Sequence, residues 1–224
     1  MRVSYSEQLE ELTNEVLEMG DKIRTRFEGS IQAMIDHDKE AADRIGKGDD
    51  EIDDQFLYVE KLCSDLLALQ QPVASDLRQI VSTFKIITDL ERIGDLIVNI
   101  TDYTVETEGS HLIDEGKIKK LGDFANGMIK RSLEAFQSED TEKARRVALA
   151  DDEMDQMCEE ATKSLLRHLI EWEEGGLDPQ EAEIKGQQVT TELLAVRDLE
   201  RVADHAVNIA ARTVYMVTTE RDLI

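Results

Sequence analysis

The chain has 224 residues, which is enough to bury a substantial hydrophobic core in one large domain or in two small ones. Its 50 Asp and Glu residues outnumber its 26 Lys and Arg residues, and the formal net charge of -24 excludes nucleic-acid-binding proteins, which need a basic surface. With only 2 prolines and 4% aromatic residues, the composition favours long helices over a β-sheet, because strands depend on aromatic and β-branched residues and on frequent turns.

Six long helices are predicted along the chain. Leu9, Leu12 and Val16 mark the first one, because their spacing of three and four residues places them on one helical face. Pro72 interrupts the pattern, since proline is tolerated in the first turn of a helix but not within it. Ser138 is expected to cap the fifth helix. The expected helices run from the beginning of the chain to His37, from Lys39 to Gln70, from Pro72 to Val105, from Asp114 to Phe136, from Ser138 to Glu173 and from Pro179 to Val217.

The second half of the chain repeats motifs of the first half. The segment 49–53 (DDEID) returns 102 positions later at 151–155 (DDEMD), and 90–95 (LERIGD) returns 109 positions later at 199–204 (LERVAD). The additional residues of the second half fall at its glycine-containing loop, where insertions are tolerated. We therefore predict an all-α fold of two tandem three-helix bundles, related by internal duplication, over residues 1–110 and 111–224.

Each repeat carries two acidic pairs, one on its second helix and one on its third. Residues four positions apart lie on one helical face, about 5–6 Å apart at Cβ, so two neighbouring helices would bring four mutually repelling carboxylates together. Such pairs are frequent by chance in an acidic chain, and only their repetition within matched sequence singles them out. A solvated acidic face, or local pairing with Arg92 and Arg201, explains the pattern without a ligand. The candidate metal ligands are Asp49, Asp53, Glu91, Asp95, Asp151, Asp155, Glu200 and Asp204.

The residue types indicate which metal would bind. Carboxylate oxygens without clustered Cys or His suit hard cations such as Mg²⁺, Mn²⁺ or Ca²⁺, or carboxylate-bridged iron. A ferritin-like di-iron site needs Glu-x-x-His on core helices, and the only match, Glu108-x-x-His111, falls in an expected loop. His205, next to Asp204, is the one histidine placed to add a ligand; an ordinary surface or interface role is the other interpretation.

The remaining polar residues give no sign of a catalytic centre. No P-loop, serine nucleophile motif or zinc-ligand spacing occurs, so no enzymatic activity is predicted. Cys63 and Cys158 are isolated and are expected to be free, partly buried thiols. Asn99 and Asn208 occupy matched positions close to the acidic faces, where they could satisfy buried polar groups or bond across helices.

Three segments resemble the signatures of the PhoU family. DLERIGD at 89–95 is followed by Asn99, DLERVADH at 198–205 is followed by Asn208, and QPVASDLR at 71–78 also matches the family's pattern. The resemblance covers nearly the whole chain. It implies a pair of three-helix bundles that regulate phosphate uptake, and it implies that the eight acidic residues are ligands of a divalent metal or iron cluster containing Mg, Mn or Fe.

The resemblance also implies partners and a location. The expected protein is a cytoplasmic negative regulator, peripheral to the membrane through the ATPase subunit of an ABC-type phosphate transporter, with a phosphate-sensing kinase as a further partner; a homodimer is left open. No signal segment or spanning helix is expected, so no direct membrane insertion is predicted. The alternatives are a metal-free helical adaptor and an accessory of a different phosphate permease. The acidic excess also indicates a halophilic host, since salt screens self-repulsion.

Overall fold

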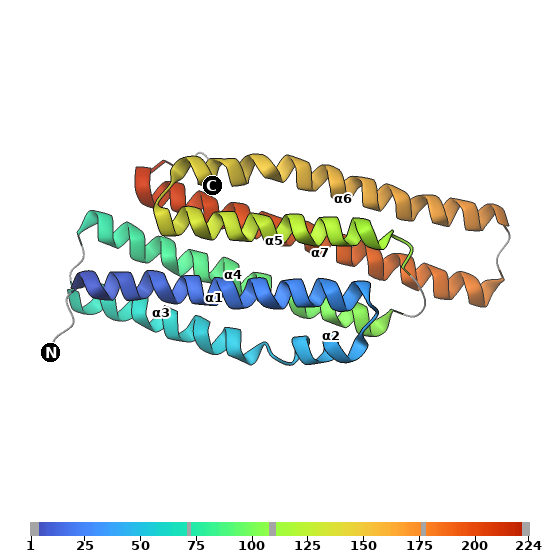
Figure 1. Cartoon of the computed structure of the whole chain (residues 1–224), viewed down its shortest axis with the longest axis horizontal. Helices are drawn as coiled ribbons and strands as arrows, with labels where there is room; N and C mark the ends of the chain where they lie inside the picture. Colours follow the sequence, from blue (N-terminus) through green and yellow to red (C-terminus); the bar gives the residue numbers. More distant parts are fainter. Residues whose placement is uncertain (1–4, 71–72, 108–110, 176–177, 221–224) are drawn as a thin grey trace.

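The computed structural model describes residues 5–70, 73–107, 111–175 and 178–220. These residues contain helices and no strand, so the predicted all-α fold is confirmed (Figure 1). The helices are α1 (Tyr5–Ile35), α2 (Lys39–Gly46), α3 (Asp50–Gln70), α4 (Ala74–Glu106), α5 (Glu115–Ser138), α6 (Thr141–Gly175) and α7 (Pro179–Thr218). None of these helices is both long and apolar enough to cross a bilayer.

The prediction of a single helix from Lys39 to Gln70 is wrong. This segment forms two helices, α2 and α3, separated by a turn at 47–49. Gly46 and Gly48 flank Lys47 there, and glycine is the weakest helix former apart from proline. A Cβ at Gly46 would lie 2.8 Å from Thr101 Oγ1, so the glycine also permits close contact with α4. At the matched positions of the second half stand Ala148 and Ala150, and α6 runs through them without a break.

The cap predicted at Ser138 is also wrong. Ser138 is the last residue of α5, and Glu139 follows it in the left-handed region with φ 52°. Asp140 caps α6 instead, because its Oδ1 accepts a hydrogen bond of 2.9 Å from the backbone N–H of Lys143. A carboxylate reaches the free N–H groups of a first helical turn from this position.

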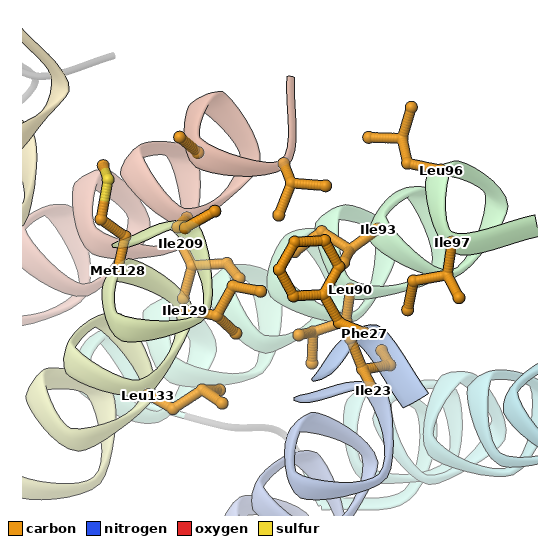
Figure 2. Packing of buried hydrophobic residues seen from close by; sticks show 14 of the residues in the cluster. Ile23, Phe27, Leu90, Ile93, Leu96, Ile97, Met128, Ile129, Leu133 and Ile209 are labelled. Carbon is orange, nitrogen blue, oxygen red and sulfur yellow. The ribbon is translucent and has the colours of Figure 1, made fainter. Parts of the chain in front are cut away.

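The helices form two halves that share one core. Helices α1 and α4 of the first half pack against α5 and α7 of the second, with α2 and α3 on one outer side and α6 on the other (Figure 1). Figure 2 shows side chains of all four inner helices meeting in this core, among them Phe27, Leu90, Ile129 and Ile209. The predicted division into 1–110 and 111–224 stays a prediction.

Matched residues of the two halves contact each other where α1 crosses α5. A Cβ at Gly20 would lie 2.4 Å from Leu133 Cδ1, and a Cβ at Gly122 would lie 2.7 Å from Ile31 Cγ2. Gly122 and Leu133 follow Gly20 and Ile31 by 102 positions, so the two contacts are equivalent. Small residues at both crossings allow the helices to approach closely, and the halves pack with approximate two-fold symmetry.

Buried polar contacts hold the connection between the halves. Glu192 of α7 is fully buried, and its carboxylate accepts hydrogen bonds from the backbone N–H groups of Leu112 at 2.7 Å and Ile113 at 2.9 Å. His111 Nε2 lies 2.7 Å from the carbonyl oxygen of Met34 near the end of α1. These contacts tie the segment entering α5 to both halves.

We expect the protein to be more stable at high salt. The net charge of -24 generates self-repulsion in the folded state, and this repulsion is screened within about 3 Å at 1 M salt. Thermal unfolding in about 0.1 M and about 2 M KCl should therefore give the higher midpoint in the more concentrated salt. An equal or lower midpoint would contradict adaptation to a saline cytoplasm.

Candidate functional site

The acidic residues predicted in the first half lie together between the start of α3 and the middle of α4. Asp49 immediately precedes α3, Asp53 lies in its first turn, and Glu91 and Asp95 lie on α4. We call these four residues the first carboxylate cluster. Burial raises the pKa of Asp53, and the negative charges of Asp49 and Asp95 raise it further. The pKa of Glu91 is raised by burial and then by Asp95.

Two arginines partly neutralise the first carboxylate cluster. Arg26 of α1 donates from Nη1 to Asp49 Oδ1 at 2.9 Å and from Nη2 to the carbonyl oxygen of Ile45 at 2.8 Å. The carbonyl oxygen of Ile45 also accepts a hydrogen bond of 3.2 Å from the backbone N–H of Gly48, so Arg26 adds a second donor at the end of α2. Arg92 lies 3.1 Å from Asp95 Oδ2 and 3.6 Å from Glu91 Oε2. This cluster therefore already contains its counter-charges.

The second carboxylate cluster consists of Asp151 and Asp155 on α6 with Glu200 and Asp204 on α7. The pKa of Asp151 is raised to about 6 by burial and by the charges of the other carboxylates, with Asp155 contributing most. Burial and neighbouring carboxylates also raise the pKa of Glu200 and of Asp204. Asp151 Oδ1 is buried and has no hydrogen-bond partner within the described ranges.

The two clusters differ in their counter-charges. In the described part of the chain, no Lys, Arg or His nitrogen lies within 4.0 Å of a carboxylate oxygen of the second cluster. Arg201, the match of Arg92, lies 3.4 Å from Asp198 instead. The position 102 residues after Arg26 is Met128, which is buried in the core. Helix α6 is continuous at the point that matches the turn after α2, and the matched position of Arg26 packs in the core without a charge.

The second cluster fits a hard cation by its chemistry. Its candidate ligands are all carboxylates, the buried Asp151 Oδ1 has no hydrogen-bond partner among the described residues, and only the charges of His205 and Arg201 lower the pKa of Asp204 against burial and Asp155, so negative charge there is only partly compensated. Among residues 5–70, 73–107, 111–175 and 178–220, no three His, Cys, Asp or Glu side chains are arranged to enclose an ion as they stand. Enclosing one would require the carboxylates to rotate toward a common point.

Two further carboxylates, Asp89 and Asp198, join the halves between the clusters. Asp198 of α7 is fully buried and accepts hydrogen bonds from Asn99 Nδ2 at 3.1 Å and Tyr103 Oη at 2.9 Å, both on α4. The guanidinium of Arg197 also donates to Asp198, from Nε at 3.0 Å and from Nη2 at 2.8 Å.

Asp89 of α4 makes the equivalent contacts in the opposite direction. Its Oδ1 lies 2.9 Å from His205 Nδ1 and accepts a bond of 3.2 Å from Asn208 Nδ2. Asn208 and Asp198 follow Asn99 and Asp89 by 109 positions, so the motif of each half supplies one acceptor and one donor to the motif of the opposite half. His205 therefore contacts an interface carboxylate, and the bonding of both asparagines across helices is confirmed.

Cys63 and Cys158 are free, as predicted, and they are fully rather than partly buried. Each Sγ lies 3.9 Å from a backbone carbonyl oxygen of the neighbouring helix, Cys63 against Ile80 and Cys158 against Val196. Burial raises the pKa of each thiol to about 12, so neither is a reactive thiolate near neutral pH.

Known proteins resemble this chain over nearly all of its length. Residues 16–104 and 118–213 match the family model described as the PhoU domain. A phosphate-specific transport system accessory protein PhoU homolog of Clostridium acetobutylicum is 34% identical over 219 residues, covering 97% of this chain and 95% of the relative. A homolog of the same description from Methanothermobacter thermautotrophicus is 28% identical and covers 98% of this chain and 97% of the relative.

Solved structures agree with these relatives. The crystal structure of PhoU from Pseudomonas aeruginosa superposes with a TM-score of 0.84 at 28% identity, covering 97% of this chain and 100% of that one. The phosphate transport system regulatory protein PhoU from Streptococcus pneumoniae superposes with a TM-score of 0.86 at 28% identity, covering 97% and 98%. With the family model matched in both halves and these relatives matched end to end, the chain belongs to the PhoU family.

Proposed function

We propose that this protein is a regulatory accessory of phosphate transport that restrains uptake when phosphate is plentiful. The observation that carries this proposal is the match to the PhoU domain in both halves, together with relatives named as accessory proteins of the phosphate-specific transport system. We infer that it acts without catalysing a reaction. A regulator of this kind works by binding one state of the transporter better than another, which shifts the population of states.

The proposed partner is the ATPase subunit of an ABC-type phosphate transporter, with a phosphate-sensing kinase as a second partner. The net charge of -24 opposes direct adsorption to a membrane surface rich in anionic lipids. A protein contact would therefore hold the chain at the cytoplasmic face of the membrane. An accessory role at a different phosphate permease would use the same kind of contact.

We also propose that the carboxylate clusters bind metal, and that the second cluster binds it more tightly. When bound, a hard cation such as Mg²⁺ or Mn²⁺, or iron, would supply positive charge in direct contact with these carboxylates. Asp151, Asp155, Glu200 and Asp204 would hold it. In the first cluster, Asp49, Asp53, Glu91 and Asp95 would have to exchange the arginine contacts for the ion.

A metal-free helical adaptor is the second candidate function. The ion pairs of Arg26 and Arg92 favour it, because they show that this fold can neutralise a carboxylate cluster without any ion. Purification without a chelator, followed by elemental analysis, would separate the two candidates. Metal at a stoichiometric level supports the metal-binding regulator, and its absence supports the adaptor.

The docking proposal predicts that the transporter ATPase subunit co-purifies with the tagged, intact protein. Deletion of the gene should raise phosphate accumulation in phosphate-replete cells, because the restraint on uptake is removed. Accumulation is measured with radiolabelled phosphate, and re-expression of the wild-type chain serves as the control. If uptake and phosphate-responsive transcription are unaltered by deletion, and no transporter subunit is recovered, the regulatory assignment is wrong.

A further inference from the structure

A groove between α5 and the beginning of α6 carries positive charge on an otherwise acidic molecule. Its volume is about 500 Å³, and its lining includes Arg131 of α5 with Lys143 and Arg146 of α6. We call it the cationic groove. Three basic residues in one groove are unexpected in a chain in which acidic residues outnumber basic ones by 50 to 26.

The basic side chains of the cationic groove make no ion pair with the acids that line it, Glu134 and Glu153. Within the described residues, Arg131, Lys143 and Arg146 make no ion pair within 4.0 Å, whereas Lys119 and Lys163 on the same two helices pair with acids four residues away. The guanidinium of Arg131 lies 5.9 Å from the ring centroid of Phe124, a contact that orients the side chain and leaves its charge in place.

Lys143 and Arg146 are three residues apart and share one face of α6. Arg131 lines the groove from α5, and its guanidinium extends along α5 toward Gly127, where a Cβ would lie 3.1 Å from Nη1. The acid Glu153 lies seven residues beyond Arg146, about 10 Å along the helix. Glu134 is nearer, but Lys130 lies 3.9 Å from its carboxylate.

The neighbouring acid Asp140 responds to the same positive charge. Its pKa is lowered first by the hydrogen bond from the backbone N–H of Lys143, and further by the charges of Lys143 and Arg146. Asp140 occupies the N-terminus of α6 with its own carboxylate, so the helix end is already capped. The groups of this region that could bind an anion are therefore the side chains of Arg131, Lys143 and Arg146.

We propose that the cationic groove binds a phosphate group, either of inorganic phosphate or of a small phosphate ester. Two guanidinium groups and one ammonium group are the side chains that bind phosphate oxygens most strongly, arginine through paired donors and lysine as a point charge. A volume of about 500 Å³ falls within the range of about 300–1,000 Å³ typical of small-ligand sites. This inference goes beyond the proposed function, because it places recognition of the effector on the regulator itself.

Only one such groove is expected in the chain. The positions that precede Arg131 and Lys143 by 102 residues are Gly29 and Ala41, which carry no charge. The first half therefore lacks two of the three cations. A stoichiometry of one phosphate group for each chain follows.

The test is titration of the full chain by calorimetry at low salt, with separate arms for inorganic phosphate, ATP and adenosine. EDTA is present in all arms, so that phosphate held by a bound metal contributes nothing and a failure here is distinct from a failure of the metal proposal. The variant K143Q/R146Q should bind the phosphate-containing ligand at least tenfold more weakly than the wild-type chain. The matched variant K61Q/K163Q makes the same change in net charge elsewhere and should bind like the wild-type chain.

The phosphate arms identify the source of the phosphate group. Tighter binding of inorganic phosphate indicates the free ion, tighter binding of ATP indicates an ester, and both support the proposal; adenosine should not bind. Circular dichroism melts of both variants establish that they fold. The proposal is overturned if no saturable binding is seen, if K143Q/R146Q binds as tightly as the wild-type chain, or if a glutamate-rich peptide binds the groove and the phosphate ligands do not.

Discussion

Replacing Asp198 with alanine is expected to lower the free energy of unfolding by about 2–3 kcal/mol, the upper part of the range for leaving buried hydrogen-bond donors without a partner. The carboxylate is fully buried where α4 meets α7, and it accepts hydrogen bonds from Asn99, Tyr103 and Arg197. Its removal leaves these donors without an acceptor in the interface between the halves. Urea unfolding followed by circular dichroism at neutral pH measures the change.

The matched residue Asp89 supplies the control for this prediction. Its side chain is 15% exposed, and it contacts His205 and Asn208, which can find water when the carboxylate is removed. Asp89→Ala should therefore cost about 1–2 kcal/mol, less than Asp198→Ala. Equal losses for the two variants, or a loss below about 1 kcal/mol for Asp198→Ala, would show that the buried contacts do not hold the halves together.

Replacing Asp151 with asparagine is expected to remove most of the metal bound by the protein. Among the described residues, the second carboxylate cluster has no cation within 4.0 Å, whereas the first cluster has Arg26 and Arg92 in contact with its acids, so metal binding at the second cluster depends more on all four negative charges. Asp49→Asn is the matched variant and should change the metal content less. Elemental analysis of both proteins, purified in parallel without chelator, gives the comparison. A larger loss for Asp49→Asn would contradict the proposed preference for the second cluster.

Asp151 is also expected to make the stability of the metal-free protein depend on pH. Folding raises the pKa of Asp151 from 3.8 to about 6, so the charged form is disfavoured in the folded state. The protein should therefore lose stability as the pH rises through about 6, and it should regain stability as the pH falls from about 7 toward 4. Asp151→Asn should remove this part of the dependence. The free energy of unfolding is measured by urea unfolding at several pH values in the presence of EDTA. If the burial of Asp151 is not the cause, its dependence on pH will be the same in Asp151→Asn as in the wild-type chain.

The helices and the acidic motifs were predictable from the sequence because both depend on local spacing. Leu12 and Val16 are fully buried on α1, as their periodicity predicts, and the acids of each half lie together because each pair follows a helical repeat. The break before Asp49 was missed, although Gly46 and Gly48 were a visible signal for it. A periodic pattern on both sides of a short turn is easily interpreted as one helix.

The contacts between the halves could not be predicted in the same way. Asp89 and Asp198 precede the repeated LER segments, but nothing in their spacing indicates that each bonds to an asparagine of the opposite half. The unequal neutralisation of the two clusters also depends on packing, since Arg26 reaches Asp49 from a helix 23 residues earlier in the chain. Such pairings depend on how helices dock, and local propensity does not determine docking.

The matched contacts across α1 and α5, and between Asp89 and Asp198, make this chain the covalent equivalent of a symmetric dimer. In two identical separate subunits, any substitution would appear on both sides of the axis at once. Joining the two units in one polypeptide allows a position and its mate to differ, as Arg26 and Met128 do. One molecule can therefore carry an acidic site that is paired with an arginine and a matched acidic site that has no such arginine.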